Sequence, residues 1–211
     1  MKFDESFVIL VNEKQIQMEN LKVVKTIGQQ IAEMEDEIRE KKKQLAQLRK
    51  KTKPKEVPDY SLLDMKGKET SLSSLFEDKD ELLLIFNMGK GCRWCTLWAD
   101  GFNGLANHLK DRAAFALLSP DKPEVAKEFS ESRGWKFRVA SDFKSPLRRD
   151  LGLRDDKGIT PAAGSFSKDA KGKLWFRNSS VFGPGDNYCV MYDLMDLLPE
   201  DSEKWEPQYS Y

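Results

Sequence analysis

Two cysteines three positions apart, Cys92 and Cys95, have the residue type and spacing for reversible disulfide chemistry. They follow an apolar run typical of a strand and precede a pattern typical of a helix, so Cys92 is predicted to lie at the amino end of that helix. Unpaired backbone N–H groups and the helix dipole favour a thiolate there, which makes Cys92 the predicted nucleophile. Cys95, one helical turn later, is the predicted resolving thiol, because a mixed disulfide on Cys92 must be broken by a thiol within reach.

The residues beside this pair are predicted to bind the substrate. Arg93 lies between the cysteines and Lys90 just before them, and their positive charge favours the thiolate further. Trp94 offers an apolar face on which a partner can dock. The predicted partner is a protein or a small thiol compound that carries a disulfide, and no metal or cofactor is predicted.

The overall composition restricts the partners and the compartment. The 35 basic residues are offset by 35 acidic ones, which argues against a general binder of nucleic acid. The apolar run Phe7–Val11 has only five residues, too few for a secretory core or a membrane span. Three cysteines in 211 residues favour one working pair in a reducing compartment over a disulfide framework. We therefore expect a cytoplasmic protein without a membrane partner.

Residues 13–52 are predicted to form one long amphipathic helix. Its apolar residues recur at intervals of three and four, with one interruption: Val24, Ile27, Ile31, Met34, Ile38, Leu45 and Leu48. This stripe is suited to a homodimer or to folding back onto the rest of the chain, and the spacing allows both. Basic runs on the exposed face are interpreted as a solvated surface rather than an RNA site. Pro54 ends the helix and predicts two parts: residues 1–53, the N-terminal segment with the helix, and residues 54–211, a globular domain.

Strands and helices are predicted to alternate in the second part. The continuous apolar run Leu82–Phe86 predicts a strand buried on both faces that leads to the cysteines. In the helix that follows, Gly101 and Gly104 imply a bend or close packing, and Asp100 and Asn103 are expected to brace it. The other predicted elements are strands at 113–118 and 136–141, a helix at 123–133, a hairpin of 162–168 with 173–179, and a last helix at 188–198.

This order of elements, with the cysteine pair at the first strand-to-helix junction, resembles the thioredoxin fold. The resemblance implies an α/β protein with three layers, in which helices flank a central mixed sheet, here with a long N-terminal helical extension. In that fold a cis proline faces the dithiol, and the residue before it offers backbone groups to the substrate. The dipeptide Thr160-Pro161 matches this position, just before the predicted hairpin. The resemblance thus implies that Thr160 and Pro161 line the docking groove.

The stretch Gly91–Gly104 resembles the signature of a narrower family, the thioredoxin-like domain of unknown function numbered 899. Further matches are Ser71-Leu72 before Leu75-Phe76, Arg133-Gly134-Trp135 ahead of a strand, and Leu194–Pro199. The resemblance covers roughly residues 15–205 and implies a dithiol-disulfide oxidoreductase. Two departures from thioredoxins matter: Phe86 stands where they bury an acidic residue, and the Arg-Trp dipeptide leaves the direction of electron flow open. The expected cytoplasmic location favours a reductase.

Other interpretations of these residues remain. Cys189 and His108 could complete a zinc site with the cysteine pair, although a buried small residue and a surface histidine are the preferred interpretations. A peroxiredoxin-like peroxidase is the nearest enzymatic alternative, but Gly89 stands where that pattern has threonine. An adaptor or oxidant sensor, assembled through the N-terminal helix, is the alternative that needs no catalysis.

Overall fold

The computed structural model describes residues 25–183, 185–199 and 204–211. The chain divides into two compact units, one that ends at Lys51 and one that runs from Thr52 to Tyr211. The apolar run Phe7–Val11 and residues 13–24 of the predicted long helix lie outside the described residues. In the ranges that are described, no helix combines the length and the apolar character needed to cross a bilayer.

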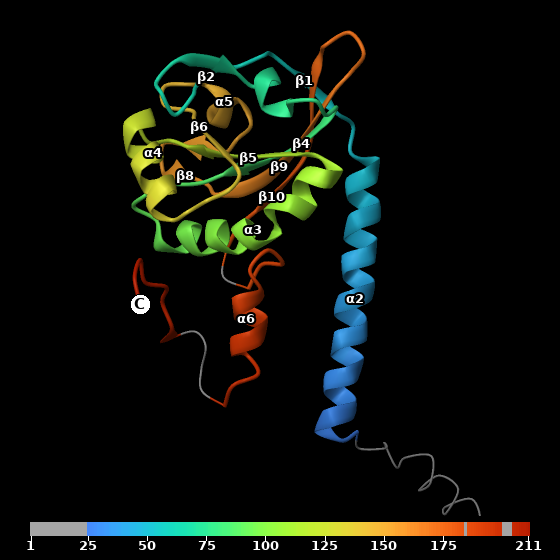
Figure 1. Cartoon of the computed structure of the whole chain (residues 1–211). Coiled ribbons are helices and arrows are strands. Elements are labelled where there is room, and N and C mark those ends of the chain that lie inside the picture. The colour runs from blue at the N-terminus through green and yellow to red at the C-terminus, as the bar shows by residue number, and fades with distance from the viewer. Residues whose placement is uncertain (1–24, 184, 200–203) are drawn as a thin grey trace, which may run out of the picture. The chain divides into compact units, whose positions relative to one another are not determined.

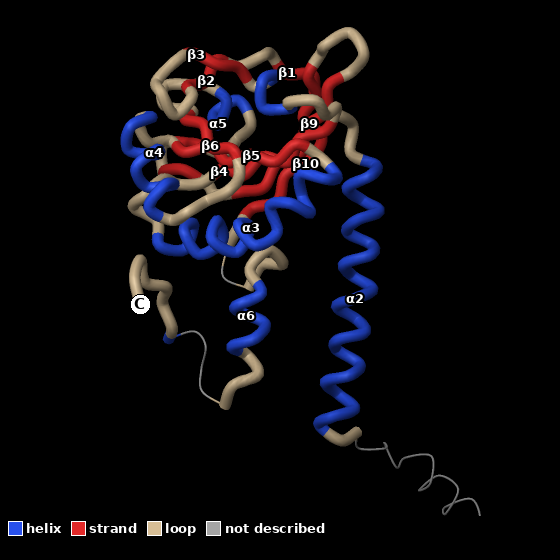
Figure 2. The backbone as a smooth tube through the Cα atoms, viewed as in Figure 1, coloured by secondary structure: helices blue, strands red, loops and turns tan. Residues whose placement is uncertain are grey.

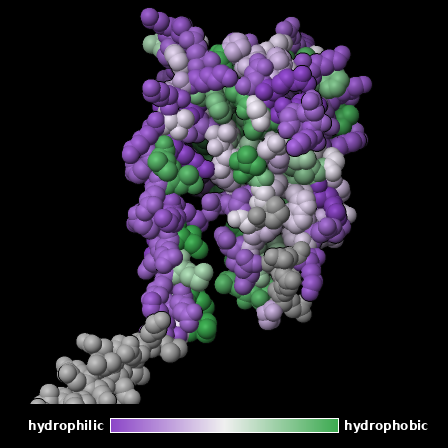
Figure 3. All heavy atoms as spheres, turned by 180° about the vertical axis from the view of Figure 1, so that it is seen from behind, coloured by the Kyte–Doolittle hydropathy of each residue, from purple (hydrophilic) through white to green (hydrophobic). Residues whose placement is uncertain are grey.

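The described part of the first unit is the helix α2 (Ile27–Lys51). Reciprocal hydrogen bonds begin it: the Gln29 backbone N–H donates to Thr26 Oγ1 at 3.2 Å, and the Thr26 N–H donates to Gln29 Oε1 at 2.9 Å. Basic residues in the last turn suit the negative end of the helix dipole. None of the residues of α2 is buried, and Figure 3 shows its apolar side chains among hydrophilic ones. The helix therefore has an apolar stripe that it does not bury by itself.

The second unit is built on an eight-stranded mixed sheet, whose strand order is β1-β10-β9-β4-β5-β6-β2-β3 (Figure 1). The strand β4 pairs in parallel with β5, and β5 with β6, whereas the other neighbouring pairs are antiparallel. The strands of this sheet are β1 (Lys55–Val57), β2 (Ser61–Leu63), β3 (Glu69–Ser71), β4 (Glu81–Phe86), β5 (Ala114–Ser119), β6 (Arg138–Ser141), β9 (Ala162–Lys168) and β10 (Leu174–Val181). A separate short hairpin joins β7 (Arg154–Asp155) to β8 (Gly158–Ile159). The helices are η1 (Ser73–Phe76), α3 (Arg93–Arg112), α4 (Pro123–Ser132), α5 (Leu147–Asp150) and α6 (Val190–Met195).

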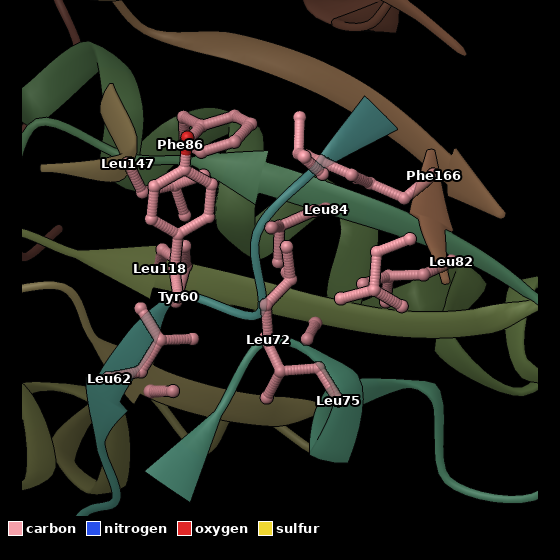
Figure 4. Close-up of a cluster of buried hydrophobic side chains, with 14 of the residues drawn as sticks. Tyr60, Leu62, Leu72, Leu75, Leu82, Leu84, Phe86, Leu118, Leu147 and Phe166 are labelled. Atoms are coloured by element: carbon pink, nitrogen blue, oxygen red, sulfur yellow. The ribbon is translucent and has the colours of Figure 1, made fainter. Parts of the chain in front are cut away.

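The two central strands are apolar at successive positions because both faces of the sheet are covered (Figure 2). Leu82, Leu84 and Phe86 point into one cluster, which Figure 4 shows with side chains from η1 and α5. Leu83 and Ile85 point the other way, into a cluster formed with α3 and with residues around α6. This second cluster includes all three cysteines, so the core on this face of the sheet supports the dithiol directly.

The predicted thioredoxin-like architecture is confirmed, and most predicted elements lie within a few residues of the observed ones. The last helix is shorter than predicted, because Leu197 and Leu198 extend beyond α6 and are exposed rather than packed. Of the bend or close packing expected at Gly101 and Gly104, the close packing is wrong, since no atom beyond the adjoining residues and the backbone of α3 lies within 4 Å of the position a Cβ would take at either residue. Asp100 and Asn103 do brace α3, by bonding the segment Arg133–Lys136.

Candidate active site

The strand β4 ends at Phe86 and leads through a short loop to Cys92, which caps the amino end of α3. The Cys95 backbone N–H donates to Cys92 Sγ at 3.1 Å. The Cys92 carbonyl accepts two bonds from Thr96, one from the backbone N–H at 3.1 Å and one from the hydroxyl at 3.0 Å. The nucleophile position expected from the sequence is therefore a true helix cap, with its sulfur aimed at unpaired donors of the first turn.

The two thiols have opposite pKa shifts. The Cys95 thiol and the backbone N–H groups of Cys95 and Trp94 donate to the Cys92 sulfur, and they lower the pKa of Cys92 to about 6 against the effect of burial. The pKa of Cys95 is raised, because its thiol is held as a donor by Cys92, is buried, and faces the negative charge of the Cys92 thiolate. Cys92 is thus a half-buried thiolate near neutral pH, and Cys95 is a buried neutral thiol.

A buried asparagine that the sequence analysis missed holds the loop and the helix together. Asn87 Nδ2 donates to the Cys95 carbonyl at 3.3 Å, and Asn87 Oδ1 accepts from the Gly89 backbone N–H at 2.7 Å. Asp121 supports the same loop, because its Oδ2 accepts from the Lys90 backbone N–H at 2.7 Å. These bonds fix the backbone on both sides of Cys92. The only signal in the sequence was a polar residue directly after an apolar strand.

A buried ion pair lies behind the dithiol. Arg148 bonds Asp142 through Nε and donates from Nη2 to the Leu118 carbonyl at 3.0 Å, the same carbonyl that accepts from the Asn87 backbone N–H. The guanidinium carbon of Arg148 lies 5.4 Å from the centre of the Phe86 ring, and its positive charge acts against the upward pKa shift of Cys95. A cation and its counterion therefore surround the position at which thioredoxins bury an acid.

Arg93 and Trp94, predicted to bind substrate, are covered by distant parts of the same unit. The Trp94 ring stacks on Tyr192 of α6 with centroids 6.0 Å apart, and its edge meets Trp205 at 6.2 Å. Arg93 Nη2 pairs with Glu206 Oε2 at 2.7 Å. The apolar face of Trp94 that the sequence analysis expected to be open thus contacts the chain itself.

The dipeptide Thr160-Pro161 lies just before β9, next to the end of β4, since Ala162 pairs with Phe86. The expected cis bond is wrong, because none of the peptide bonds in the described ranges is cis. The Thr160 backbone N–H donates to the Leu153 carbonyl at 2.9 Å, and the Pro161 carbonyl accepts from Phe182 at 2.9 Å. The Thr160 N–H is therefore already used within the chain, whereas the Pro161 carbonyl can still accept a second bond.

Cys189 and His108 are placed differently from each other. Cys189 is buried in the cluster that holds the dithiol, next to Tyr192, whose hydroxyl is buried without a hydrogen-bond partner among the described residues. His108 is exposed near the far end of α3, sixteen residues from Cys92 and so about 24 Å away along the helix. Among the residues described, no group of three or more histidine, cysteine or acidic side chains is placed to hold a metal ion.

Comparisons with known proteins identify the family and the fold of the chain. The sequence model of the family described as "Bacterial protein of unknown function (DUF899)" matches residues 17–204, as the resemblance predicted. No curated protein matches the sequence.

Among solved structures, peroxidoxin BcpB from Mycobacterium tuberculosis is 22% identical, with a TM-score of 0.52 over 68% of this chain and 92% of that one. Peroxiredoxin Q from Xanthomonas campestris is 18% identical, with a TM-score of 0.51 over 64% and 85% of the two chains. A mutant of PrxQ from Xylella fastidiosa is 14% identical, with a TM-score of 0.53 over 67% and 91%. At these identities the likeness establishes the thioredoxin fold.

Proposed function

Because this chain belongs to the DUF899 family and has the thioredoxin fold, we propose that it is a thiol-disulfide oxidoreductase with Cys92 as nucleophile and Cys95 as resolving thiol. The observation that carries the proposal is the position of Cys92 at the amino end of α3, where the Cys95 backbone N–H donates to its sulfur at 3.1 Å. In this position the pKa of Cys92 is lowered, while the pKa of the buried Cys95 thiol is raised.

The reaction proceeds by two exchanges. The Cys92 thiolate attacks one sulfur of the substrate disulfide, and the other sulfur leaves as a thiolate that takes up a proton. Once Cys92 is bound in the mixed disulfide, its negative charge no longer opposes ionisation of Cys95. Cys95 then loses its proton and attacks Cys92 Sγ, which releases the second substrate thiol. Two electrons pass to the substrate, and the Cys92–Cys95 disulfide must be reduced by an external dithiol or two monothiols.

Two groups behind the dithiol support the second exchange. The Arg148 cation favours the Cys95 thiolate, and Asn87 holds the Cys95 carbonyl so that this turn of α3 keeps its position. We propose a reductase of disulfides in proteins or small molecules, acting in the cytoplasm. Arg93 and Trp94 are the proposed substrate contacts, and Thr160 and Pro161 border the same end of β4.

The proposal is tested by trapping the intermediate. In Cys95→Ser, an oxidised protein such as insulin should form a mixed disulfide with Cys92 that mass spectrometry detects and dithiothreitol removes. Cys92→Ser should form none. Cys189→Ser is the matched control, and it should reduce insulin at close to the normal rate. Equal insulin reduction by Cys92→Ser and by the unmodified chain would contradict the proposal.

A thiol peroxidase is the second candidate, favoured by the peroxiredoxins among the similar structures and by the lowered pKa of Cys92. In that reaction the Cys92 thiolate takes one peroxide oxygen to form a sulfenic acid while the other leaves as water or alcohol. Cys95 then condenses with the sulfenic acid and releases water. Consumption of hydrogen peroxide that Cys92→Ser abolishes, at a rate above that of insulin reduction, would favour this candidate.

A further inference from the structure

Residues 204–211 lie across the first turn of α3 and contact the residues beside the dithiol. Trp205 meets the Trp94 ring, Glu206 pairs with Arg93, and the Tyr209 hydroxyl donates to the Lys90 carbonyl at 3.0 Å. These three contacts reach the three positions that the sequence analysis assigned to the surroundings of the dithiol. A segment more than a hundred residues away in sequence therefore occupies the surface expected to receive the substrate.

The far end of this segment is also held by α4, through the same Tyr209 whose hydroxyl reaches the Lys90 carbonyl. The Tyr209 ring packs edge-on against Phe129 of α4 at 6.2 Å, and the Tyr209 carbonyl accepts a bond from Arg133. At the near end, the ion pair of Arg93 and Glu206 is exposed, and such pairs contribute little to stability. Loss of the contacts of Trp205 and Glu206 would uncover Arg93 and Trp94 while the contacts of Tyr209 with α4 remain.

The contacts of the near end define what this surface recognises. The Trp94 ring stacks on Tyr192 and makes an edge-on contact with the ring of Trp205, and Arg93 pairs with the carboxylate of the next residue, Glu206. Aromatic stacking and pairing of a guanidinium with a carboxylate are both directional contacts. The positive charge of Arg93, which lies between the two cysteines, complements the negative charge of Glu206.

We infer that the surface formed by Lys90, Arg93 and Trp94 binds the polypeptide around a substrate disulfide, with a preference for an aromatic residue followed by an acidic one. Residues 205–209 occupy this surface and compete with the substrate. The inference rests on the proposed oxidoreductase function and adds the class of substrate: protein disulfides in an aromatic and acidic context. The rate at which small disulfides are reduced depends less on this segment, because they need no such docking.

The test removes the contacts of Trp205 and Glu206 in the full chain. In Trp205→Ala/Glu206→Gln, kcat/KM for reduction of insulin by dithiothreitol should rise at least threefold through a lower KM, while the rate with oxidised glutathione should change less than twofold. Glu56→Gln, which removes an equally exposed ion pair with Lys173, is the matched control and should change neither rate. Melting temperatures of all variants are measured alongside.

A synthetic peptide of residues 204–211 provides the second measurement. Added to Trp205→Ala/Glu206→Gln, it should inhibit insulin reduction, and the same peptide with lysine in place of the glutamate should inhibit at least fivefold less. Equal rates for the variant and the unmodified chain, or no inhibition by the peptide, would overturn the inference and leave the oxidoreductase function standing. Failure of every form, including the unmodified chain, to reduce either disulfide would contradict the proposed function and the inference with it.

Discussion

The sulfur of Cys92 is surrounded by donors that all come from the first turn of α3. Because the Cys95 thiol is the largest contributor to the lowered pKa of Cys92, the two cysteines act as one unit rather than as two independent thiols. The charge on Cys92 is in turn one of the reasons that Cys95 stays protonated. In the proposed reaction, the exchange at Cys92 removes this charge and thereby prepares Cys95 for the next step.

The reactivity of Cys92 should follow this pKa. The thiolate forms as the pH rises, so alkylation of Cys92 by iodoacetamide should increase from pH 5, reach half its maximum near the pKa of about 6, and level off above neutral pH. In Cys95→Ala the midpoint should move to higher pH, because the thiol donor is lost. The rate is measured by mass spectrometry, in a Cys189→Ser background. An unchanged midpoint in Cys95→Ala would contradict the assigned cause of the shift.

The effect of the buried Asn87 on the active site can be compared with that of Asn103, which makes similar bonds in an exposed place. Asn87→Ala should destabilise the protein by about 1–3 kcal/mol, because two bonded backbone groups lose a buried partner, and should also change the alkylation midpoint of Cys92. Asn103→Ala is the matched control, since Asn103 also accepts one backbone bond and donates another on α3, but in an exposed place. Asn103→Ala should lower the free energy of unfolding by about 1 kcal/mol and leave the alkylation midpoint of Cys92 unchanged. Urea unfolding measures the stability of the two variants, and the pH profile of alkylation measures their Cys92 midpoints.

The predicted and the missed site residues differ in how far their partners lie along the chain. The roles of Cys92 and Cys95 depend on each other and on one helix end, so their spacing was sufficient to suggest them. Arg148 matters because folding brings it against Phe86 and the Leu118 carbonyl, and no local pattern indicates such contacts. The expected openness of Trp94 failed for the same reason, since Trp205 covers it from far away in sequence.

Among the elements, α3 carries the dithiol and also contains two exposed glycines. Gly101 and Gly104 lie on its exposed side with open space around them, where glycine costs backbone entropy and gains no contact. The Asp100 and Asn103 side chains hold this part of the helix to the segment Arg133–Lys136 instead.

Two glycines of this region should respond to alanine in opposite ways. Gly101→Ala should stabilise the protein by about 0.5–1 kcal/mol, because helix propensity improves and nothing obstructs the new methyl group. Gly89→Ala should destabilise it by about 1–3 kcal/mol, since Gly89 has φ +92° and its Cβ would lie 2.8 Å from the Asp121 carboxylate oxygens. Urea unfolding measures both. A destabilising Gly101→Ala would show that the exposed side of α3 is packed in solution.

The element pattern was largely predictable because the strongest signals were local. Leu82–Phe86 is apolar throughout since both sheet faces are covered, and the alternation of strand and helix then restricted the topology. The bond before Pro161 was misjudged because it was inferred from the fold pattern, whereas the geometry there is fixed by bonds to Leu153 and Phe182.

On the scale of the whole molecule, the helix α2 and the thioredoxin fold form separate units. The helix α2 does not bury its own apolar stripe, so the stripe is free to pack on a second copy or on another part of the chain. The homodimer and the division into residues 1–53 and 54–211 remain predictions.

The stripe should mediate self-association of the chain. Replacing Ile27, Ile31 and Ile38 together by glutamate should convert a dimer to a monomer in light scattering, because a paired apolar seam cannot bury three carboxylates. Replacing Ala32, Ala46 and Gln47, which lie off the stripe, by glutamate introduces the same charge and should leave the mass unchanged. The same mass for the isoleucine variant and the unmodified chain would contradict dimerisation through α2.

The central claim is that Cys92 and Cys95 form a working dithiol, and a redox titration tests it most directly. The protein is equilibrated in glutathione buffers of graded potential while the fluorescence of Trp94 and Trp98 is followed and free thiols are counted by alkylation and mass. We predict one reversible two-electron transition that removes two thiols, is retained in Cys189→Ser and is lost in Cys92→Ser. Three thiols that stay reduced over the whole range, or a transition that survives in Cys92→Ser, would contradict the account.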